Sequence, residues 1–326
     1  MNERKQALEV IPIFELIRED LERVERKMRE ASSIEYEQLR AALDYLLGSG
    51  GKRLRPALVL LASKFHPADD DKVASLAAAV ETLHTATLIH DDLIDNSILR
   101  RGNPTLNALW NSAATVLTGD YLFARAAAFA AQTESVRVVS IFAQTLMTIC
   151  DGELRQIFDS DEGKTTRDYY YQRIYSKTAS LFAASTETGA ILSGAPEAEV
   201  QALRDYGYNL GMAFQIADDV LDFIGNEGVL GKPVGGDLRQ GIITLPTIYF
   251  LEAHPGDETV ARVLSGQDEG VRAAVEMIKG SGAIESSTAE AKSFAARSRN
   301  ALSVLPHNEY RQAMFDLADF VVERRK

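Results

Sequence analysis

Residues 73–95, VASLAAAVETLHTATLIHDDLID, indicate the class of fold that the whole sequence predicts. Alanine, which has the highest helix propensity, recurs through this stretch together with leucine. A strand would be predicted by an alternating run of β-branched residues bounded by turn residues, and the sequence contains no such run. Similar alanine-rich or amphipathic stretches predict helices over residues 13–31, 35–47, 53–65, 105–131, 136–158, 166–193 and 199–222, with shorter ones after about residue 255. We therefore expect an all-α fold and exclude a Rossmann fold or a barrel.

The composition is that of a folded globular protein, because 46% of the 326 residues are hydrophobic and 25% are charged. Lys and Arg number 35 against 47 Asp and Glu, and the resulting net charge of −12 argues against a nucleic-acid partner. Cys150 is the only cysteine, which excludes a disulfide framework and favours a cytoplasmic location. No apolar run reaches the roughly 18 residues of a transmembrane segment, and the N-terminus lacks the apolar core of a secretion signal.

The breaks between the predicted helices are short, so they do not indicate a flexible linker between domains. The longest is the glycine-rich segment GNEGVLGKPVGGD at residues 225–237. Several predicted helices are apolar on most of their faces, as helices buried in a large bundle are. We therefore expect residues 1–326 to form a single domain, a large helical bundle around a deep central cavity.

The acidic pattern DDxxD occurs twice, each time inside an apolar run. Its members are Asp91, Asp92 and Asp95 in HDDLID, and Asp218, Asp219 and Asp222 in ADDVLD. Positions i and i+4 of a helix lie about 40° apart around its axis, so the first and last aspartate of each cluster point the same way. Like charges at this spacing destabilise a helix, which a bound cation would relieve. Oxygen ligands favour Mg²⁺, particularly where a phosphate completes the coordination shell. The alternative is a solvated acidic face, which the apolar neighbours disfavour.

Basic residues gather in the predicted turns. GGKRLRP at residues 50–56 places Lys52, Arg53 and Arg55 at a helix start, where backbone N–H groups favour an anion. The other basic residues of these turns are Arg100, Arg101, Lys177, Lys232 and Arg239. Taken singly, each is an ordinary surface cation. Together with two carboxylate clusters they predict a polyanionic substrate, held partly by metal and partly by Lys and Arg. His84, two helical turns before the first cluster, is either a structural histidine or a donor to a phosphate oxygen.

Six motifs resemble those of the trans, or head-to-tail, isoprenyl diphosphate synthases and occur in the same order. They are GGKRLRP, HTATLIHDDLIDNS, RRGNPT, KTASLF, FQIADDVLDF and GKPVGGDLRQGIITLP, from about residue 50 to 247. The first cluster is similar to that of the polyprenyl branch. The resemblance implies a large all-α bundle around a deep cavity, usually a homodimer. It also implies Mg²⁺, three ions with substrate bound, between two facing aspartate clusters.

The resemblance assigns roles to residues of this chain. Asp91, Asp95 and Asp218 would bind the metal, and Asp92, Asp219 and Asp222 would support these ligands. The allylic diphosphate would be bound by Arg100, Lys177, Thr178, Gln215 and Lys232. Isopentenyl diphosphate would be bound by Lys52, Arg55, His84 and Arg101. With the six aspartates, Lys177, Thr178 and Gln215 would carry the catalysis, the last two by steadying an allylic cation.

The implied reaction breaks the carbon–oxygen bond of the allylic diphosphate, joins the cation to isopentenyl diphosphate and releases a proton. Ala86 and Thr87, just before the first cluster, are small and would let the growing chain pass. Phe142, near Val138, would form a deeper floor, or it is plain core. We expect an all-trans product of about seven to ten isoprene units, by analogy alone. Release of such a product would involve transient contact with a membrane. Ile242 departs from the family pattern, in which many relatives have a lysine. Either Arg239 replaces this lysine or the contact is not needed in this branch.

Three alternatives stay open. The chain could be a shorter-chain farnesyl or geranylgeranyl synthase, which differs only in product length. It could be a terpene cyclase or a head-to-head synthase of the same fold, but these need no isopentenyl site and GGKRLRP argues against them. It could also be a non-catalytic or partner-dependent subunit of a hetero-oligomeric prenyl synthase. The intact aspartate clusters disfavour a non-catalytic subunit, and they say nothing about dependence on a partner.

Overall fold

The computed structural model describes most of the chain and confirms the all-α fold. The described residues are 12–30, 34–48, 51–100, 102–159, 165–225, 234–266 and 270–323. Within these ranges, regular structure is helical apart from one short hairpin of β1 (Leu99–Arg100) and β2 (Asn103–Pro104). The chain forms two compact units. The first comprises Met1–Gln144, Ala184–Arg204 and Val304–Met314, and the second comprises Thr145–Ala183, Asp205–Ser303 and Phe315–Lys326.

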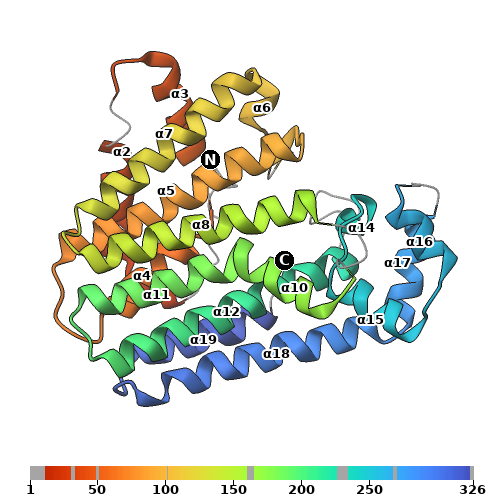
Figure 1. Cartoon of the computed structure of the whole chain (residues 1–326). Coiled ribbons are helices and arrows are strands. Elements are labelled where there is room, and N and C mark those ends of the chain that lie inside the picture. Colours follow the sequence, from red (N-terminus) through yellow and green to blue (C-terminus); the bar gives the residue numbers. More distant parts are fainter. Residues whose placement is uncertain are drawn as a thin grey trace. The chain divides into compact units, whose positions relative to one another are not determined.

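Both units consist of helices, which Figure 1 shows along the chain. The first holds α1 (Pro12–Glu15), α2 (Arg18–Glu30), α3 (Glu37–Gly48), α4 (Leu54–Ser63), α5 (Asp70–Ile94), α6 (Leu106–Leu109) and α7 (Ser112–Ala131). The second holds α10 (Arg167–Ile174), the π-helix η2 (Tyr175–Ala179), α14 (Gly236–Arg239), α15 (Leu245–Ala253), α16 (Glu258–Leu264), α17 (Val271–Gly280) and α18 (Ala283–Ala301). Elements with residues in both units are α8 (Val136–Phe158), α11 (Ser180–Leu192), α12 (Glu197–Ile224), the 3₁₀ turn η3 (Leu302–Val304) and α19 (Glu309–Glu323).

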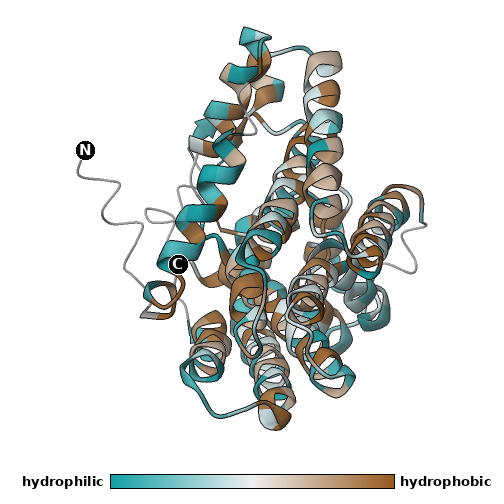
Figure 2. Ribbon diagram, turned by 90° about the vertical axis from the view of Figure 1, so that its left-hand side faces the viewer, coloured by the Kyte–Doolittle hydropathy of each residue, from teal (hydrophilic) through white to brown (hydrophobic). Residues whose placement is uncertain are grey.

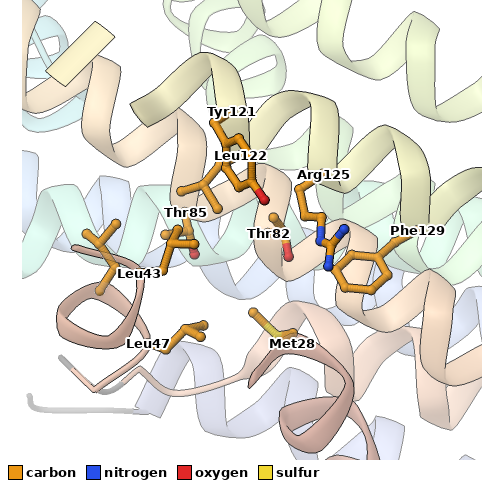
Figure 3. Close-up of a pocket in the computed structure, with 10 residues that line it drawn as sticks. Met28, Leu43, Leu47, Thr82, Thr85, Tyr121, Leu122, Arg125 and Phe129 are labelled. Atoms are coloured by element: carbon orange, nitrogen blue, oxygen red, sulfur yellow. The ribbon is translucent and has the colours of Figure 1, made fainter. Parts of the chain in front are cut away.

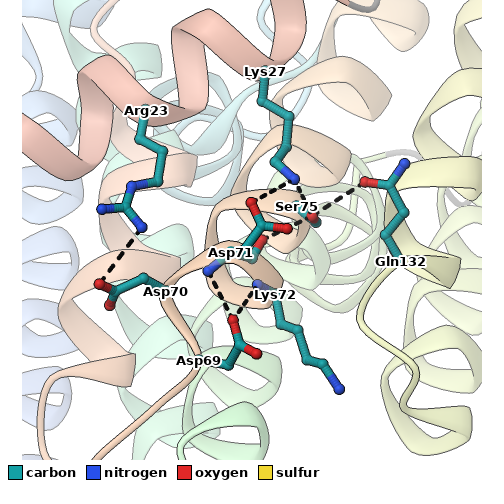
Figure 4. Close-up of polar contacts among 8 residues, drawn as sticks. All are labelled: Arg23, Lys27, Asp69, Asp70, Asp71, Lys72, Ser75 and Gln132. Carbon is teal, nitrogen blue, oxygen red and sulfur yellow. Dashed lines mark hydrogen bonds and ion pairs between the residues drawn. The ribbon is translucent and has the colours of Figure 1, made fainter.

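Helix α5 is the centre of the first unit, where it packs against α2, α4 and α7 (Figure 1). Its N-terminus is fixed by polar contacts, which Figure 4 shows. The Asp69 carboxylate caps the helix by accepting hydrogen bonds from the backbone N–H groups of Asp71 and Lys72. Lys27 of α2 reaches Asp71 and the Ser75 hydroxyl, both at 2.9 Å. These contacts fix the start of the helix whose last turn carries the first aspartate cluster.

The core of the first unit is closely packed. Hydrophilic and hydrophobic residues alternate along many helices, as helices that bury one face require (Figure 2). A cavity of about 20 Å³ lies among α2, α3, α5 and α7, next to Met28, Leu43 and Phe129 (Figure 3). This volume has room for about one water molecule. We therefore read it as a gap in the core and not as a ligand site.

In the second unit, a cluster around Phe223 and Leu238 joins α12, α14, α15, α16 and α17. Gly211 of α12 lies directly against Ala179 of η2, because a Cβ at residue 211 would come within 2.6 Å of the Ala179 Cα. Only glycine permits this close approach of two backbones. It brings the α12 residues of the predicted site next to those of η2.

The predicted helices form, but their boundaries differ in three places. The helix expected over 13–31 is broken between α1 and α2, and that over 105–131 is broken where Asn111 caps α7. The helix over 166–193 is interrupted by η2. Beyond residue 255 the helices are not all short, since α18 has 19 residues. No helix in the described ranges is long and apolar enough to cross a membrane.

Candidate active site

The first aspartate cluster lies at the C-terminal end of α5, with Asp95 as the C-cap residue. Asp92 is buried, and Nε of Arg100 donates to both of its carboxylate oxygens, at 2.8 and 2.9 Å. Arg100 belongs to β1, so the hairpin places a positive charge next to the first cluster. This charge neutralises part of the cluster's negative charge. Asp91 is half-buried and Asp95 is exposed. The negative end of a helix dipole repels further carboxylates, so this position favours a cation.

The second cluster, near the end of α12, shows the same division. Asp219 is buried and accepts hydrogen bonds from Gln215 Nε2 and from the Tyr170 hydroxyl, both at 2.8 Å. Asp222 accepts from the backbone N–H groups of Gly236 and Asp237, at 3.2 and 3.1 Å. Asp218, like Asp91, is half-buried. In both clusters the second aspartate is thus held inside by protein donors while the first is less buried.

Asp237 was missed by the sequence analysis. Burial raises its pKa to about 7, and the negative charges of Asp219 and Asp222 add to the rise. Burial also raises the pKa of Asp219 to about 6, although its hydrogen bonds and the charge of Arg173 oppose the rise. Asp218, Asp219, Asp222 and Asp237 thus lie near one another. Carboxylates gathered in a partly buried setting favour a bound cation. In the described part of the chain, no three His, Cys, Asp or Glu side chains are already gathered as a metal site.

The π-helix η2 supplies Lys177 and Thr178. The Thr178 hydroxyl donates to Oε1 of Gln215 at 2.8 Å, and the Gln215 amide donates in turn to Asp219. Lys177 is exposed, and its ammonium donates to Glu153 of α8 at 2.8 Å. The structure therefore joins Thr178, Gln215 and Asp219 in one hydrogen-bonded chain. Thr178 lies in a π-helical turn, and such turns are frequent at functional sites.

The residues predicted to bind isopentenyl diphosphate lie where α4 starts against α5. Nη1 of Arg55 lies 3.0 Å from Nε2 of His84. Arginine only donates, so His84 accepts here through a neutral nitrogen. A cavity of about 80 Å³ is lined by His84, Asp92 and Arg100 among others. It thus brings together members of the two predicted substrate groups. Lys52 precedes α4 and is exposed.

The remaining residues predicted for the site differ in burial, and two of them are not described by the structure. Arg101 and Lys232 lie outside the described residues. Ala86 is fully buried in a packed cluster of the first unit, and Thr87 is half-buried. Val138 and Phe142 of α8 are both buried. Arg239 is exposed at the end of α14, and Ile242 is half-buried shortly after it.

Comparison with known proteins identifies the relatives. The sequence pattern described as Polyprenyl synthetase matches residues 36–279. Heptaprenyl diphosphate synthase component 2 of Geobacillus stearothermophilus is 41% identical over 313 residues, covering 96% of this chain and 98% of that protein. A polyprenyl synthase structure from Caulobacter crescentus CB15, complexed with calcium and isoprenyl diphosphate, has a TM-score of 0.91 and 39% identity, covering 96% and 97% of the two chains. A decaprenyl diphosphate synthase from Rhodobacter capsulatus has a TM-score of 0.89 and 40% identity, covering 97% and 99%.

These relatives share the all-α fold with this chain over nearly its whole length, and they define its class as a prenyltransferase. The chain belongs to the polyprenyl synthetase family.

Proposed function

We propose that this prenyltransferase condenses isopentenyl diphosphate head-to-tail with an allylic prenyl diphosphate, giving a medium- or long-chain all-trans polyprenyl diphosphate. The observation that carries the proposal is that the two aspartate clusters share one pattern of burial. Asp92 and Asp219 are buried and held by protein donors, while Asp91 and Asp218 are less buried. Relatives named for heptaprenyl and decaprenyl products support the product class.

Mg²⁺ is the metal that this donor set fits, because all the ligands are carboxylate oxygens and the substrate supplies phosphate. We assign Asp91, Asp95 and Asp218 as its ligands, with three ions in the substrate complex. Bound Mg²⁺ would neutralise the negative charge that develops on the diphosphate leaving group. Asp92 and Asp219 would orient the ligands, since their own carboxylates are fixed by Arg100 and by Tyr170.

The side chains divide the remaining work. Arg100, Lys177 and Lys232 would bind the allylic diphosphate, whose carbon–oxygen bond breaks to give pyrophosphate and an allylic cation. Thr178 and Gln215 would steady this cation with their oxygens. Lys52, Arg55, His84 and Arg101 would hold isopentenyl diphosphate so that its double bond attacks. The new carbon–carbon bond forms, and the proton that leaves is taken up by the released pyrophosphate.

We propose a homodimer, because α7 and α8 each expose apolar side chains to solvent. Contiguous apolar surface that a folded protein leaves exposed marks an interaction site. The exposed residues are Val116, Leu117, Val136, Val139, Met147, Leu154, Ile157 and Phe158. The second candidate is a catalytic subunit that needs a different partner, and the relative named as a component 2 favours it. For either assembly we propose a cytoplasmic location with transient membrane contact during product release.

The proposal is tested with the purified protein alone, incubated with labelled isopentenyl diphosphate, farnesyl diphosphate and Mg²⁺. Chromatography of the products is expected to show a ladder that ends in one chain of about seven to ten isoprene units. A product that ends at four units from farnesyl diphosphate, or at three units from a shorter primer, would identify a shorter-chain synthase. No incorporation by folded protein with any of several primers would refute independent activity. Addition of extract fractions would then show whether a partner restores it.

A further inference from the structure

Arg53 of the GGKRLRP motif has a backbone conformation that residues other than glycine rarely adopt. Its φ of 49° and ψ of 30° place it in the left-handed region directly before α4. Such residues are strained, and they persist where other contacts hold them. The carbonyl of Arg53 accepts the first hydrogen bond of α4, from the N–H of Ala57 at 3.1 Å. The turn at Arg53 therefore sets the direction in which α4 starts, and with it the positions of Lys52 and Arg55.

The Arg53 side chain makes contacts that hold this turn. Nη1 donates to Oε1 of Glu81 on α5 at 2.7 Å, and Nη2 donates to the carbonyl of Leu47 at 3.3 Å. Nε lies 3.6 Å from Oε1 of Glu25 on α2. The side chain of Glu81 is only 8% exposed and that of Arg53 is 20% exposed. The pair is therefore shielded from water and salt, and loss of one partner would leave a buried charge uncompensated.

Arg55 and His84 form the next contact along the same seam between α4 and α5. His84 follows Glu81 by three residues, so both side chains lie on one face of α5. Arg55 follows Arg53 by two residues in the first turn of α4. Arg53, Glu81 and His84 also line one cavity. The contact between Arg53 and Glu81 therefore fixes where Arg55 meets His84.

We propose that Arg53 and Glu81 are positioning residues for the isopentenyl substrate. Their ion pair holds the left-handed turn before α4 and so aligns Lys52, Arg55 and His84 with one diphosphate. Arg53 acts through Glu81, and it does not itself bind the substrate. The inference rests on the proposed function, because it assumes that these three residues bind isopentenyl diphosphate.

A double-mutant cycle of Arg53→Gly and Glu81→Gln in the full-length enzyme tests this role. Glycine adopts the left-handed backbone without strain but is not held in it, so Arg53→Gly permits the turn and removes the ion pair that fixes it. We expect each single variant to raise KM for isopentenyl diphosphate about tenfold, with KM for farnesyl diphosphate changed less than about twofold. The double variant should be no worse than either single variant, because the two residues act as one unit. Additive losses would mean that Arg53 binds the diphosphate directly, and they would overturn the proposal, as would an unchanged KM.

Lys72→Gln is the matched control. Lys72 lies on α5, as Glu81 does, and the substitution breaks its exposed ion pair with Glu134, which follows α7. Its kinetic constants should equal those of the wild type. If Glu81→Gln does not fold, Arg53→Met with Glu81→Met removes both charges and leaves none buried alone. The same selective rise in KM is then expected, and a normal KM would overturn the positioning role. Failure of the unmodified enzyme to form any product would instead refute the proposed function.

Discussion

A carboxylate near the C-terminal end of a helix faces the negative end of the helix dipole, and both DDxxD motifs lie there. Asp91, Asp92 and Asp95 end α5, and Asp218, Asp219 and Asp222 lie close to the end of α12. Arg100 neutralises Asp92 of the first cluster, and neutral donors hold Asp219 and Asp222. Carboxylates gathered at the negative end of a helix dipole are unfavourable for the folded protein alone and favourable for binding a cation.

Replacement of a proposed metal ligand should therefore remove turnover and leave the fold intact. We expect Asp91→Ala and Asp218→Ala each to lower kcat at least about a hundredfold, because the leaving group then lacks charge neutralisation. Single-turnover assays at saturating Mg²⁺ and farnesyl diphosphate measure the effect. Asp70→Ala, at the other end of α5, breaks only an exposed ion pair with Arg23 and should keep full turnover. A nearly normal rate in either ligand variant would contradict the metal assignment.

The pKa of Asp237, raised from 3.8 to about 7, predicts how pH affects stability. Between these values the folded protein keeps a proton that the unfolded chain has lost, so this group's contribution to stability decreases as pH rises from about 4 to 7. Asp237→Asn removes the titration and should stabilise the protein at pH 8 by on the order of 4 kcal/mol, but not at pH 4. Urea unfolding in the presence of a chelator measures both. Equal stability of the two proteins at pH 8 would contradict the raised pKa.

The position of Ala86 changes how product length is best tested. Because Ala86 is fully buried in a packed cluster with Leu43 and Leu122, a larger side chain there would overpack the core and cost stability. Thr87 is only half-buried, so Thr87→Phe adds bulk with less strain. We expect Thr87→Phe to shorten the final product by at least one isoprene unit at similar stability, measured by chromatography of the polyprenyl alcohols. Thr87→Ser is the control, and an unchanged product from Thr87→Phe would show that the chain does not pass this residue.

At the scale of elements, the sequence predicts which stretches are helical but not how they meet. Alanine content and apolar spacing are local properties, and they indicate α5, α8 and α12 nearly to their ends. The π-helix η2 is not predictable in this way, because one extra residue in a turn leaves helix propensity unchanged. The bond between Tyr170 and Asp219 joins residues 49 apart in the chain, so no local pattern reveals it. The motifs are visible in the sequence, whereas the contacts of Tyr170 and of Asp237, which lies inside the last motif, depend on the tertiary fold.

Deletion of Ser176 tests whether η2 matters as an element. The deletion would turn the π-helix into an ordinary helical turn and rotate Tyr170 by about 100° relative to Thr178. Both residues belong to the network around Gln215 and Asp219, so we expect kcat to fall at least about a hundredfold while helicity by circular dichroism is kept. Asp69→Ala is the control for an ordinary loss of stability, since it removes the cap of α5 at about 1 kcal/mol. Full activity of the deletion variant would rule out a role for η2.

At the scale of the whole molecule, the sequence predicts an all-α prenyltransferase but leaves its assembly undetermined. Net charge and apolar content describe the chain as a whole, and they do not say which faces of α7 and α8 are covered. The structure shows that Leu117 and Phe158 are among the exposed apolar side chains of these helices. An apolar helix face that stays exposed in the single chain is unfavourable in water, which is why we propose a second copy as its cover.

A charge placed on these faces should separate the subunits. We expect the wild type to have the mass of a dimer by size-exclusion chromatography with light scattering, and Leu117→Glu with Phe158→Glu to have that of a monomer. A glutamate buried at a subunit interface without a partner loses its hydration, so association becomes unfavourable. Met277→Glu on α17 adds the same charge to an exposed apolar position elsewhere and should leave the dimer intact. A wild type that is monomeric and active would refute the homodimer. A monomeric and inactive wild type would favour the partner-dependent subunit, because the apolar faces would then await a different protein.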